Sequence, residues 1–385
     1  MSNGNILVLS WDRKTYLEAL DAGREDIESE MWPDKIIELE PVGYSDANII
    51  WEWTFWDHLI QDHDSTLSNF GVIADHPELL DINLVSLDLA ALGYCDWTHS
   101  NSIDYNEELD QILISCRNLH EIYIIDHSTS TEEAAGHTGG ISGMGGDILY
   151  RWGNPMNYGR GQQENRMLIG QHDANWISSD YPGEDNILIY NNGSITSFGQ
   201  DFTQSSVVQI EPPLNEFGLY DIDEIHSFAP FHYSWEYTGD FFSHIMSGVR
   251  RLENGNSIVT AATEKRIFEV TSDGHIVWDY IHDEDGQNSI STQTNLLGDN
   301  YEVLILFYWD GNPNSLVQDV DYFYWGDSQG LTWFGVNKTG ISTYADDTSF
   351  AIQEQNILGF HSDGFTYKRV SLTEELGELG PQNSI

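Results

Sequence analysis

The sequence predicts an all-β fold, a six-bladed β-propeller whose blades are four-stranded antiparallel sheets. One unit recurs four times: an Asn, Gly or Asp turn, an apolar run such as ILV, a second short strand that ends in an acidic residue, and an aromatic strand of the W-x-W or W-x-Y type. Aromatic residues make up 12% of the chain, which favours strands over helices. Helical periodicity is almost absent, and its best example is residues 13–31. A repeated strand-rich unit indicates a radial or stacked β array.

The four copies occupy residues 3–53, 110–152, 185–237 and 254–280, and the innermost strand of each blade is expected just before its copy. Two degenerate units follow residue 288, EVLILFYW with DYFYWG, and then LTWFGV with FAIQEQN and GFTYKRV. Counting them gives about six blades, within the usual range of roughly four to eight, and we expect one domain over residues 1–385. A β-sandwich is the competing class, but its strands would not carry a recurring aromatic third element.

The charge of the chain excludes several partners. Fifteen basic residues stand against 63 acidic ones, for a formal net charge of -48, so nucleic acid and anionic membrane surfaces would be repelled. We interpret the excess as a solvated acidic surface of the kind found in salt-rich, halophilic or marine habitats, where ions screen self-repulsion. No run approaches about 18 apolar residues, so no membrane span is expected, and the first residues lack the pattern of a signal peptide.

Metal and cofactor motifs are not recognised. The acidic runs QDHDST and SLVQDVDY lack the spacing of a calcium loop, and GMGGD is not followed by a helix as a phosphate loop would be. We therefore predict no metal site and no cofactor. The two cysteines, Cys95 and Cys116, do not form a disulfide framework, and the strand pairing expected below places Cys116 opposite Ser100.

Two histidines occupy nearly equivalent positions in successive repeats. His99 lies 13 residues before the ILI run that begins at Ile112, and His172 lies 15 residues before the ILI run that begins at Ile187. Both would sit on innermost strands, which converge at the central channel of a propeller. A lone histidine is more often structural, but repetition at one place in the unit favours a shared function for this pair.

The hairpin after His99 supplies a partner. If the turn NEELD centres on Glu108, antiparallel pairing places Arg117 opposite His99, with Cβ atoms about 5 Å apart. The same alignment places Asn192 opposite His172, as an uncharged group that can orient an imidazole. The alternative for Arg117 is a salt bridge to one of the many carboxylates.

Several motifs resemble a known family. They are DWTHSNSIDYNEELDQILISCRNLHEIYIIDHST, YRWGNP followed by GQHDANW, WPDKIIELEP with ANIIWEWTFWDHLIQD, and LENGNSIVTAATEKRIFEVTSDGHIVWDY. Together they cover about residues 3–281, and they resemble the arylsulfotransferase family, PAPS-independent aryl-sulfate sulfotransferases built on a β-propeller. From residue 288 onward there is no resemblance.

The resemblance implies a site and a reaction. The histidine of the GQH motif, here His172, is the nucleophile that takes the sulfuryl group and becomes a sulfohistidine, while His99 and Arg117 match the residues that bind the sulfate. His58, in the family-like WDH, could line the site as well. Arg151 belongs to residues 146–176, which gather three arginines in a chain poor in them, and is a further candidate for substrate binding.

The family also has a further sulfate-binding histidine on an inner strand, and the repeat spacing places that position ahead of Met1. The first blade is therefore expected to be incomplete or to be completed by the C-terminus. Relatives are commonly exported, so the resemblance implies a periplasmic or extracellular protein, although this chain shows no signal peptide.

The first hypothesis is an enzyme that moves a sulfuryl group from a phenolic sulfate ester to a phenol acceptor. A second is an inactive propeller that serves as a binding or scaffold module, and a third is an aryl sulfatase in which water accepts the group. Incubation with a chromogenic aryl sulfate, with and without a phenol, distinguishes all three.

Overall fold

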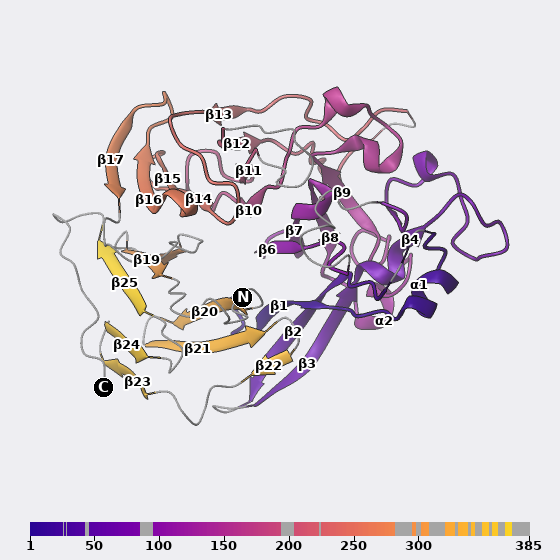
Figure 1. The fold of residues 1–385 in the computed structure, drawn as a ribbon, viewed down its shortest axis with the longest axis horizontal. Helices are drawn as coiled ribbons and strands as arrows, with labels where there is room; N and C mark the ends of the chain where they lie inside the picture. Colours follow the sequence, from indigo (N-terminus) through magenta and orange to yellow (C-terminus); the bar gives the residue numbers. More distant parts are fainter. Residues whose placement is uncertain are drawn as a thin grey trace. The chain divides into compact units, whose positions relative to one another are not determined.

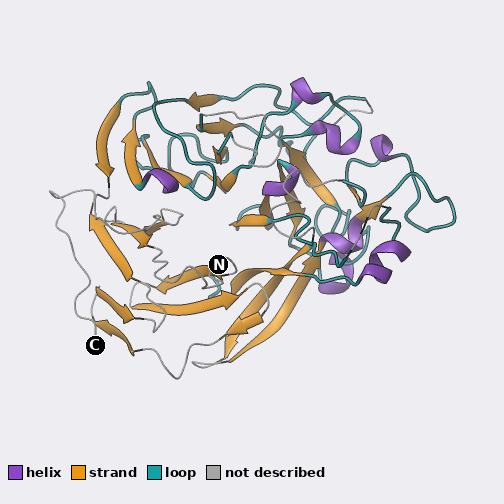
Figure 2. Ribbon diagram, in the orientation of Figure 1, coloured by secondary structure: helices purple, strands orange, loops and turns teal. Residues whose placement is uncertain are grey.

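The computed structural model describes residues 1–281 apart from 26, 28, 43–45, 85–94, 194–203 and 223–224, and beyond residue 281 it describes strands only. The protein is all-β, with several four-stranded antiparallel sheets and few helices (Figures 1 and 2). The chain divides into two compact units, Met1–Asp240 and Phe241–Ile385, which are described separately. The six-blade count and the single domain over 1–385 stay predictions.

The first unit contains three antiparallel sheets in which strands follow one another in chain order. The first predicted repeat forms a three-stranded sheet of β1 (Ile6–Trp11), β2 (Asp34–Val42) and β3 (Asp46–Thr54). The second forms β6 (Ser100–Asn106), β7 (Gln111–Cys116), β8 (Glu121–Asp126) and β9 (Ile148–Trp152). The third forms β10 (His172–Trp176), β11 (Ile187–Asn191), β12 (Ser206–Ile210) and β13 (Trp235–Tyr237). The inner strands predicted before the second and third copies, β6 and β10, are thus confirmed.

The second unit begins with the fourth repeat, a sheet of β14 (Gly248–Arg251), β15 (Ser257–Ala261), β16 (Arg266–Val270) and β17 (Ile276–Ile281). The strands that follow are β18 (Asn295–Leu297), β19 (Glu302–Phe307), β20 (Val320–Asp327), β21 (Gly330–Asn337), β22 (Gly340–Ser342), β23 (Ser349–Gln353), β24 (Asn356–Phe360) and β25 (Thr366–Ser371).

The grouping of segments predicted for the two degenerate units is wrong, because the members of each unit lie in different sheets. The sequence grouped EVLILFYW with DYFYWG, yet β19 pairs with β18 and β25, while β20 pairs with β21. Likewise β23 pairs with β24 rather than with β21. Only two residues separate β20 from β21, and so short a connection favours direct pairing as a hairpin over pairing with a more distant strand.

Helices are short. The helix expected within residues 13–31 is α1 (Tyr16–Asp21), which begins with a capping box between Thr15 and Glu18. The other helical turns are α2 (Thr131–Ala134), η1 (Phe55–His58), η2 (Ile73–Asp75), η3 (Arg117–Leu119), η4 (Pro155–Tyr158), η5 (Gln163–Asn165) and η6 (Ala262–Glu264), and a two-stranded parallel bridge joins β4 (Leu59–Ile60) to β5 (Leu80–Asp81). Within the described part of the chain, no helix is long and apolar enough to cross a membrane.

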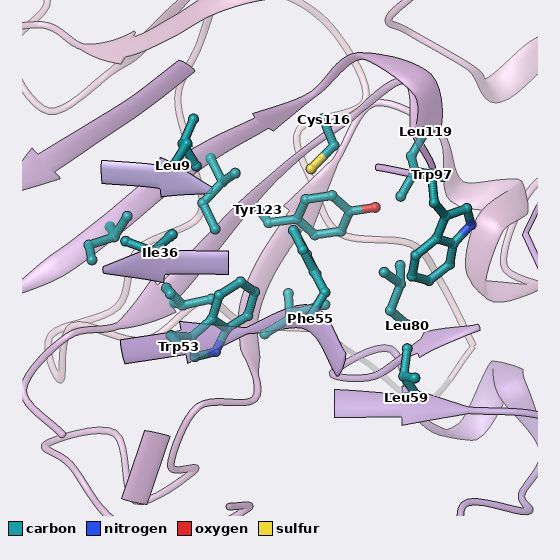
Figure 3. Close-up of a cluster of buried hydrophobic side chains, with 14 of the residues drawn as sticks. Leu9, Ile36, Trp53, Phe55, Leu59, Leu80, Trp97, Cys116, Leu119 and Tyr123 are labelled. Atoms are coloured by element: carbon teal, nitrogen blue, oxygen red, sulfur yellow. The ribbon is translucent and has the colours of Figure 1, made fainter. Parts of the chain in front are cut away.

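The sheet of β6–β9 is buried on both faces, because the side chains of a strand alternate between them. On β7, Ile112, Ile114 and Cys116 pack into a cluster with Trp53 and other residues of β1–β3 (Figure 3). Leu113, which points the other way, packs into a second cluster with residues of β9, β11 and β12. The uninterrupted apolar run ILI therefore reflects a sheet with two apolar neighbours.

Candidate active site

His99 is held just before the first residue of β6 by a left-handed turn. Its φ is 50°, a conformation that is uncommon for a residue with a side chain and is enriched at functional sites. The turn brings its Nδ1 into a short hydrogen bond with Oδ2 of Asp96, a residue whose side chain is 6% exposed. Because the carboxylate accepts this bond, Nδ1 carries the proton. The Nε2 atom takes no part in this bond, and the His99 side chain is 25% exposed.

Arg117 is a direct neighbour of His99, as predicted. Its backbone N–H donates to the His99 carbonyl at 3.1 Å, and Ser100 pairs with Cys116 one position further along the hairpin. The predicted register holds only at this end, because a β-bulge between Ser100 and Ser102 shifts the remaining pairs by one residue. Bulges re-aim side chains and are frequent beside active sites.

The Arg117 side chain is buried and ordered by its neighbour. It lies at the start of η3 rather than on β7, and its Nη1 donates to Oδ1 of Asn118 at 3.0 Å. Asn118 in turn donates to the Asp96 carbonyl at 2.8 Å. One hydrogen-bonded loop therefore positions both basic side chains, His99 and Arg117.

His172 is the first residue of β10, and a register shift follows it on that strand too. Its Nδ1 lies 2.8 Å from Oδ1 of Asn192 and 3.1 Å from the carbonyl oxygen of Gly170. A backbone carbonyl can only accept, so Nδ1 carries the proton and Nε2 carries the lone pair. Asn192 contacts His172 as predicted, although the residue opposite His172 in the ladder is Tyr190.

The electrostatic environment keeps this imidazole neutral. Burial of the ring, and next the positive charge of Arg117, lower the pKa of His172 to about 3, and the charge of His99 lowers it further. The hydrogen bonds that Nδ1 donates to Asn192 and Gly170 raise the pKa and are outweighed. An unprotonated Nε2 in the field of the Arg117 guanidinium is suited to attack an electrophile that carries negative oxygens.

The loop that carries His172 is anchored to the preceding sheet. Gln171, fully buried, donates from Nε2 to the carbonyls of Cys116 at 3.0 Å and Glu121 at 2.9 Å. The Gln171 carbonyl accepts from Nδ2 of Asn101 at 2.7 Å, and the Gly170 N–H donates to Nδ1 of His120 at 2.9 Å. These bonds join the His172 loop to both the His99 strand and the Arg117 turn.

Two further predicted residues lie in other surroundings. Arg151 forms a bidentate ion pair with Glu121, at 3.0 Å from Nε and 2.5 Å from Nη2, and both side chains are fully buried. His58 contacts Asp147 and the Ala134 carbonyl. Among the described residues, the structure therefore brings together His99, Arg117, His172 and Asn192, and places Arg151 and His58 in polar clusters of their own.

Sequence reasoning missed the residues that hold this site. Asp96 stands three positions before His99, but only the left-handed turn makes the two meet. Gln171 and Asn101 lie inside the recognised GQH and WTHSN motifs and could have been found there as anchors. His120 could not, because its role depends on the turn of η3.

Comparisons with known proteins place the chain in a family. The model of the Arylsulfotransferase (ASST) family matches residues 1–301, and the chain belongs to this family. The family supports a sulfotransferase function and aryl compounds as small-molecule substrates. No curated protein matches the chain.

Solved structures show only distant likeness. A Pseudomonas aeruginosa periplasmic gluconolactonase is 10% identical, with 97% of this chain and 81% of that chain covered at a TM-score of 0.38. A protein of unknown function from Bacteroides caccae is 11% identical, with 80% and 87% covered at 0.36. A streptogramin B lyase is 14% identical, with 74% and 84% covered at 0.34. None of these activities is transferred to this chain.

Proposed function

We propose that the protein is an aryl-sulfate sulfotransferase that moves a sulfuryl group from a phenolic sulfate ester to a phenol without PAPS, through a sulfohistidine at His172. The observation that carries the proposal is the neutral imidazole with its pKa lowered to about 3, held in the Nδ1–H form near Arg117 and His99. Membership of the family supplies the class of reaction.

The first half-reaction begins with attack of His172 Nε2 on the sulfur of the donor. The N–S bond forms as the S–O bond to the aryl group breaks, and the phenolate leaves with the bonding pair and takes a proton from solvent. The oxygens of the transferring group carry negative charge, and the Arg117 guanidinium would stabilise them as a fixed donor. A second proton on His99, at Nε2, would let that imidazole donate to them as well. Asp96 holds the orientation of that imidazole.

The second half-reaction is the reverse with a new phenol. The acceptor oxygen attacks the sulfur, the N–S bond breaks, and its electron pair returns to Nε2 while the phenolic proton passes to solvent. The Nδ1–H bonds to Asn192 and Gly170 persist throughout, so the ring needs no tautomer change between the two steps.

The proposal is tested with a chromogenic aryl sulfate labelled at sulfur, with and without a phenol. His172→Ala should be inactive with every acceptor and should take up no label. His99→Ala and Arg117→Ala should lose on the order of 10²- to 10³-fold in rate yet still accumulate labelled enzyme. The matched control is His76→Ala, which changes an exposed histidine that pairs with Glu78.

Label on a peptide that contains His172, stable in alkali and labile in acid, would support the histidine adduct. Substantial turnover by His172→Ala, or label on tyrosine or serine, would overturn the assignment. Release of sulfate without a phenol would indicate a sulfatase, and an inert wild-type protein would favour a binding or scaffold module.

A further inference from the structure

A second group of histidines lies outside the candidate active site and has no part in the proposed reaction. Oδ1 of Asp147 lies 2.8 Å from Nδ1 of His58 and 2.7 Å from Nδ1 of His137. One potential ligand atom from each residue lies within 4.8 Å of the others. The three residues come from η1, from the glycine-rich segment 134–146 and from the residue that precedes β9, so no spacing in the sequence announces them.

The second ring nitrogen of His58, Nε2, has the kind of hydrogen-bond partner that is common for metal-binding histidines. Its Nε2 lies 2.9 Å from the carbonyl oxygen of Ala134, which can only accept, so Nε2 carries a proton. Metal-binding histidines commonly donate their other ring N–H to such a carbonyl or to a carboxylate. The Nδ1 atom, rather than Nε2, is therefore directed at the Asp147 oxygen.

The buried part of this group is rigid. The Trp53 ring stacks on the His58 ring, with centroids 5.7 Å apart and planes 10° apart, and its Nε1 donates to the Gly146 carbonyl at 2.7 Å. A side chain at Gly146 would overlap the Ala134 carbonyl and would lie 2.7 Å from His58 Nε2. Only glycine therefore allows the segment to approach His58 this closely.

The other side of the group is open. The side chain of His137 is 60% exposed, whereas that of Asp147 is 9% exposed and that of His58 is fully buried. An ion between the three atoms would thus be reached from solvent, and water could complete its coordination. Zinc held by three protein ligands and water is a common arrangement.

We propose that His58, His137 and Asp147 bind one divalent first-row transition-metal ion, of which Zn²⁺ is the probe. Two imidazoles with one carboxylate suit such ions, whereas Ca²⁺ and Mg²⁺ require mainly oxygen ligands. Tetrahedral bonds of about 2.0–2.2 Å place ligand atoms roughly 3.4 Å apart, so the contacts at 2.7 and 2.8 Å need to open by about 0.6–0.7 Å. Rotation of the exposed His137 ring would lengthen its own contact with Asp147, and rotation of the Asp147 carboxylate would lengthen the contact with His58.

The ion would fasten the segment 134–146 to the first sheet. Its backbone already closes on itself, since the Gly146 N–H donates to the Gly136 carbonyl at 3.0 Å. A bond from His137 to a metal also held by His58 would join this closed segment to η1. The inference does not depend on the proposed sulfotransferase activity.

The test uses the full chain, stripped with a chelator and returned to chelator-free buffer. Calorimetric titration with ZnCl₂ should give one equivalent per chain, and the thermal midpoint should rise as ZnCl₂ saturates the site. Neither CaCl₂ nor MgCl₂ at the same concentration should produce that rise. Co²⁺ should give the intense visible absorption of a site with four or five ligands.

His137→Ala is the decisive variant, because an exposed side chain can be removed without loss of folding. It should weaken Zn²⁺ binding at least tenfold and abolish the Co²⁺ absorption, and Asp147→Asn should do the same at nearly constant shape. His76→Ala, at an exposed histidine whose Nδ1 contacts Glu78, should bind as the wild type does. His172→Ala should also bind Zn²⁺ as the wild type does, and that result would exclude binding at the candidate active site.

Wild-type protein that takes up no stoichiometric Zn²⁺ would overturn the proposal and leave a hydrogen-bonded His–Asp–His group. Equal affinity in the wild type and His137→Ala would also overturn it, because the ion would then be bound elsewhere.

Discussion

Two basic groups in the first unit, the fully buried Arg151 and the partly buried His172, differ in the partners that hold them. Arg151 has a carboxylate, because Glu121 accepts from two of its nitrogens, and it also donates to the Leu79 carbonyl at 3.0 Å. The rings of Tyr123 and Tyr158 lie against its guanidinium. His172 instead has two neutral acceptors on Nδ1, the side chain of Asn192 and the carbonyl of Gly170.

The difference decides what each group can do. Burial lowers the pKa of Arg151 and is the largest single influence on it, but the attraction and hydrogen bonds of Glu121, together with Tyr123 and Tyr158, outweigh it. The pKa therefore lies above its ordinary value, and the group is a permanent charge balanced by its partner. Nothing among the contacts described for His172 stabilises its cation to that extent, and its pKa falls to about 3. A charged partner therefore indicates a structural ion pair, while neutral partners preserve a reactive lone pair.

The largest effect is expected from removing Arg151. Arg151→Met leaves the Glu121 carboxylate buried without its partner, which typically costs roughly 3–5 kcal/mol of folding free energy. Urea unfolding measures that loss. Aryl-sulfate turnover per folded molecule should be retained, because Arg151 contacts none of His99, Arg117 and His172.

The matched control is Arg266→Met in the sheet of β14–β17. Arg266 makes the same bidentate geometry with Asp279, at 2.9 and 2.7 Å, but the Asp279 side chain is 40% exposed. Its removal should cost roughly 0–1 kcal/mol. Similar losses in the two variants would show that burial of the Glu121–Arg151 pair is not what distinguishes it.

The sequence was sufficient for the repeated part of the fold and for the central residues of the site. Turns, apolar runs and aromatic strands repeat in one order, so the four units and the strands β6 and β10, which precede two of them, could be predicted. His99 and Arg117 followed from hairpin pairing, which needed only the turn. The bulge between Ser100 and Ser102 could not be predicted, because pairing rules assume an unbroken ladder.

Partners that are distant in sequence set the surroundings of two further candidates, Arg151 and His58. Arg151 was assigned to the site because basic residues are scarce, but its environment is set by Glu121, 30 positions earlier on the adjacent strand. His58 was assigned to the site from a local motif, while its contacts come from Ala134 and Asp147. Local patterns place a residue on an element, whereas its function depends on what tertiary structure brings against it.

Giving His172 the kind of partner that Arg151 has should change its titration. In Asn192→Asp, a carboxylate within hydrogen-bond distance of Nδ1 favours the imidazolium and should raise the pKa of His172 by roughly 1–3 units. Protonated His172 cannot attack, so the acid limb of the profile of kcat/KM against pH should move upward by the same amount. The measurement is that profile with a chromogenic aryl sulfate.

Asn191→Asp is the control for an added carboxylate at the neighbouring residue. Asn191 accepts from the Ile169 N–H at 2.9 Å, donates to the Met167 carbonyl at 3.3 Å and makes no hydrogen bond to His172. Aspartate there loses only the donor to Met167 and does not reach the ring. Its acid limb should stay with that of the wild type. An unchanged limb in Asn192→Asp, or an equal shift in both variants, would contradict the role given to the neutral amide.

The smallest effect concerns stability against pH. The unfolded chain binds a proton at His172 below about pH 6.5, whereas the folded protein does so only near pH 3. Between these values the unfolded state holds more protons, so this group lowers folding stability as the pH falls. His172→Asn removes this penalty. As the pH falls from 7.5 to 5.0, the free energy of unfolding of the variant should rise relative to that of the wild type, by on the order of 1 kcal/mol once the exposed part of the ring is discounted.

Thermal midpoints at the two pH values measure this relative gain. His275→Asn, at a side chain that is 79% exposed, is the control for loss of a histidine. A difference in thermal midpoint between wild type and His172→Asn that does not change with pH would show that His172 is protonated equally in the folded and unfolded states. That result would contradict the assignment of His172 as a neutral nucleophile.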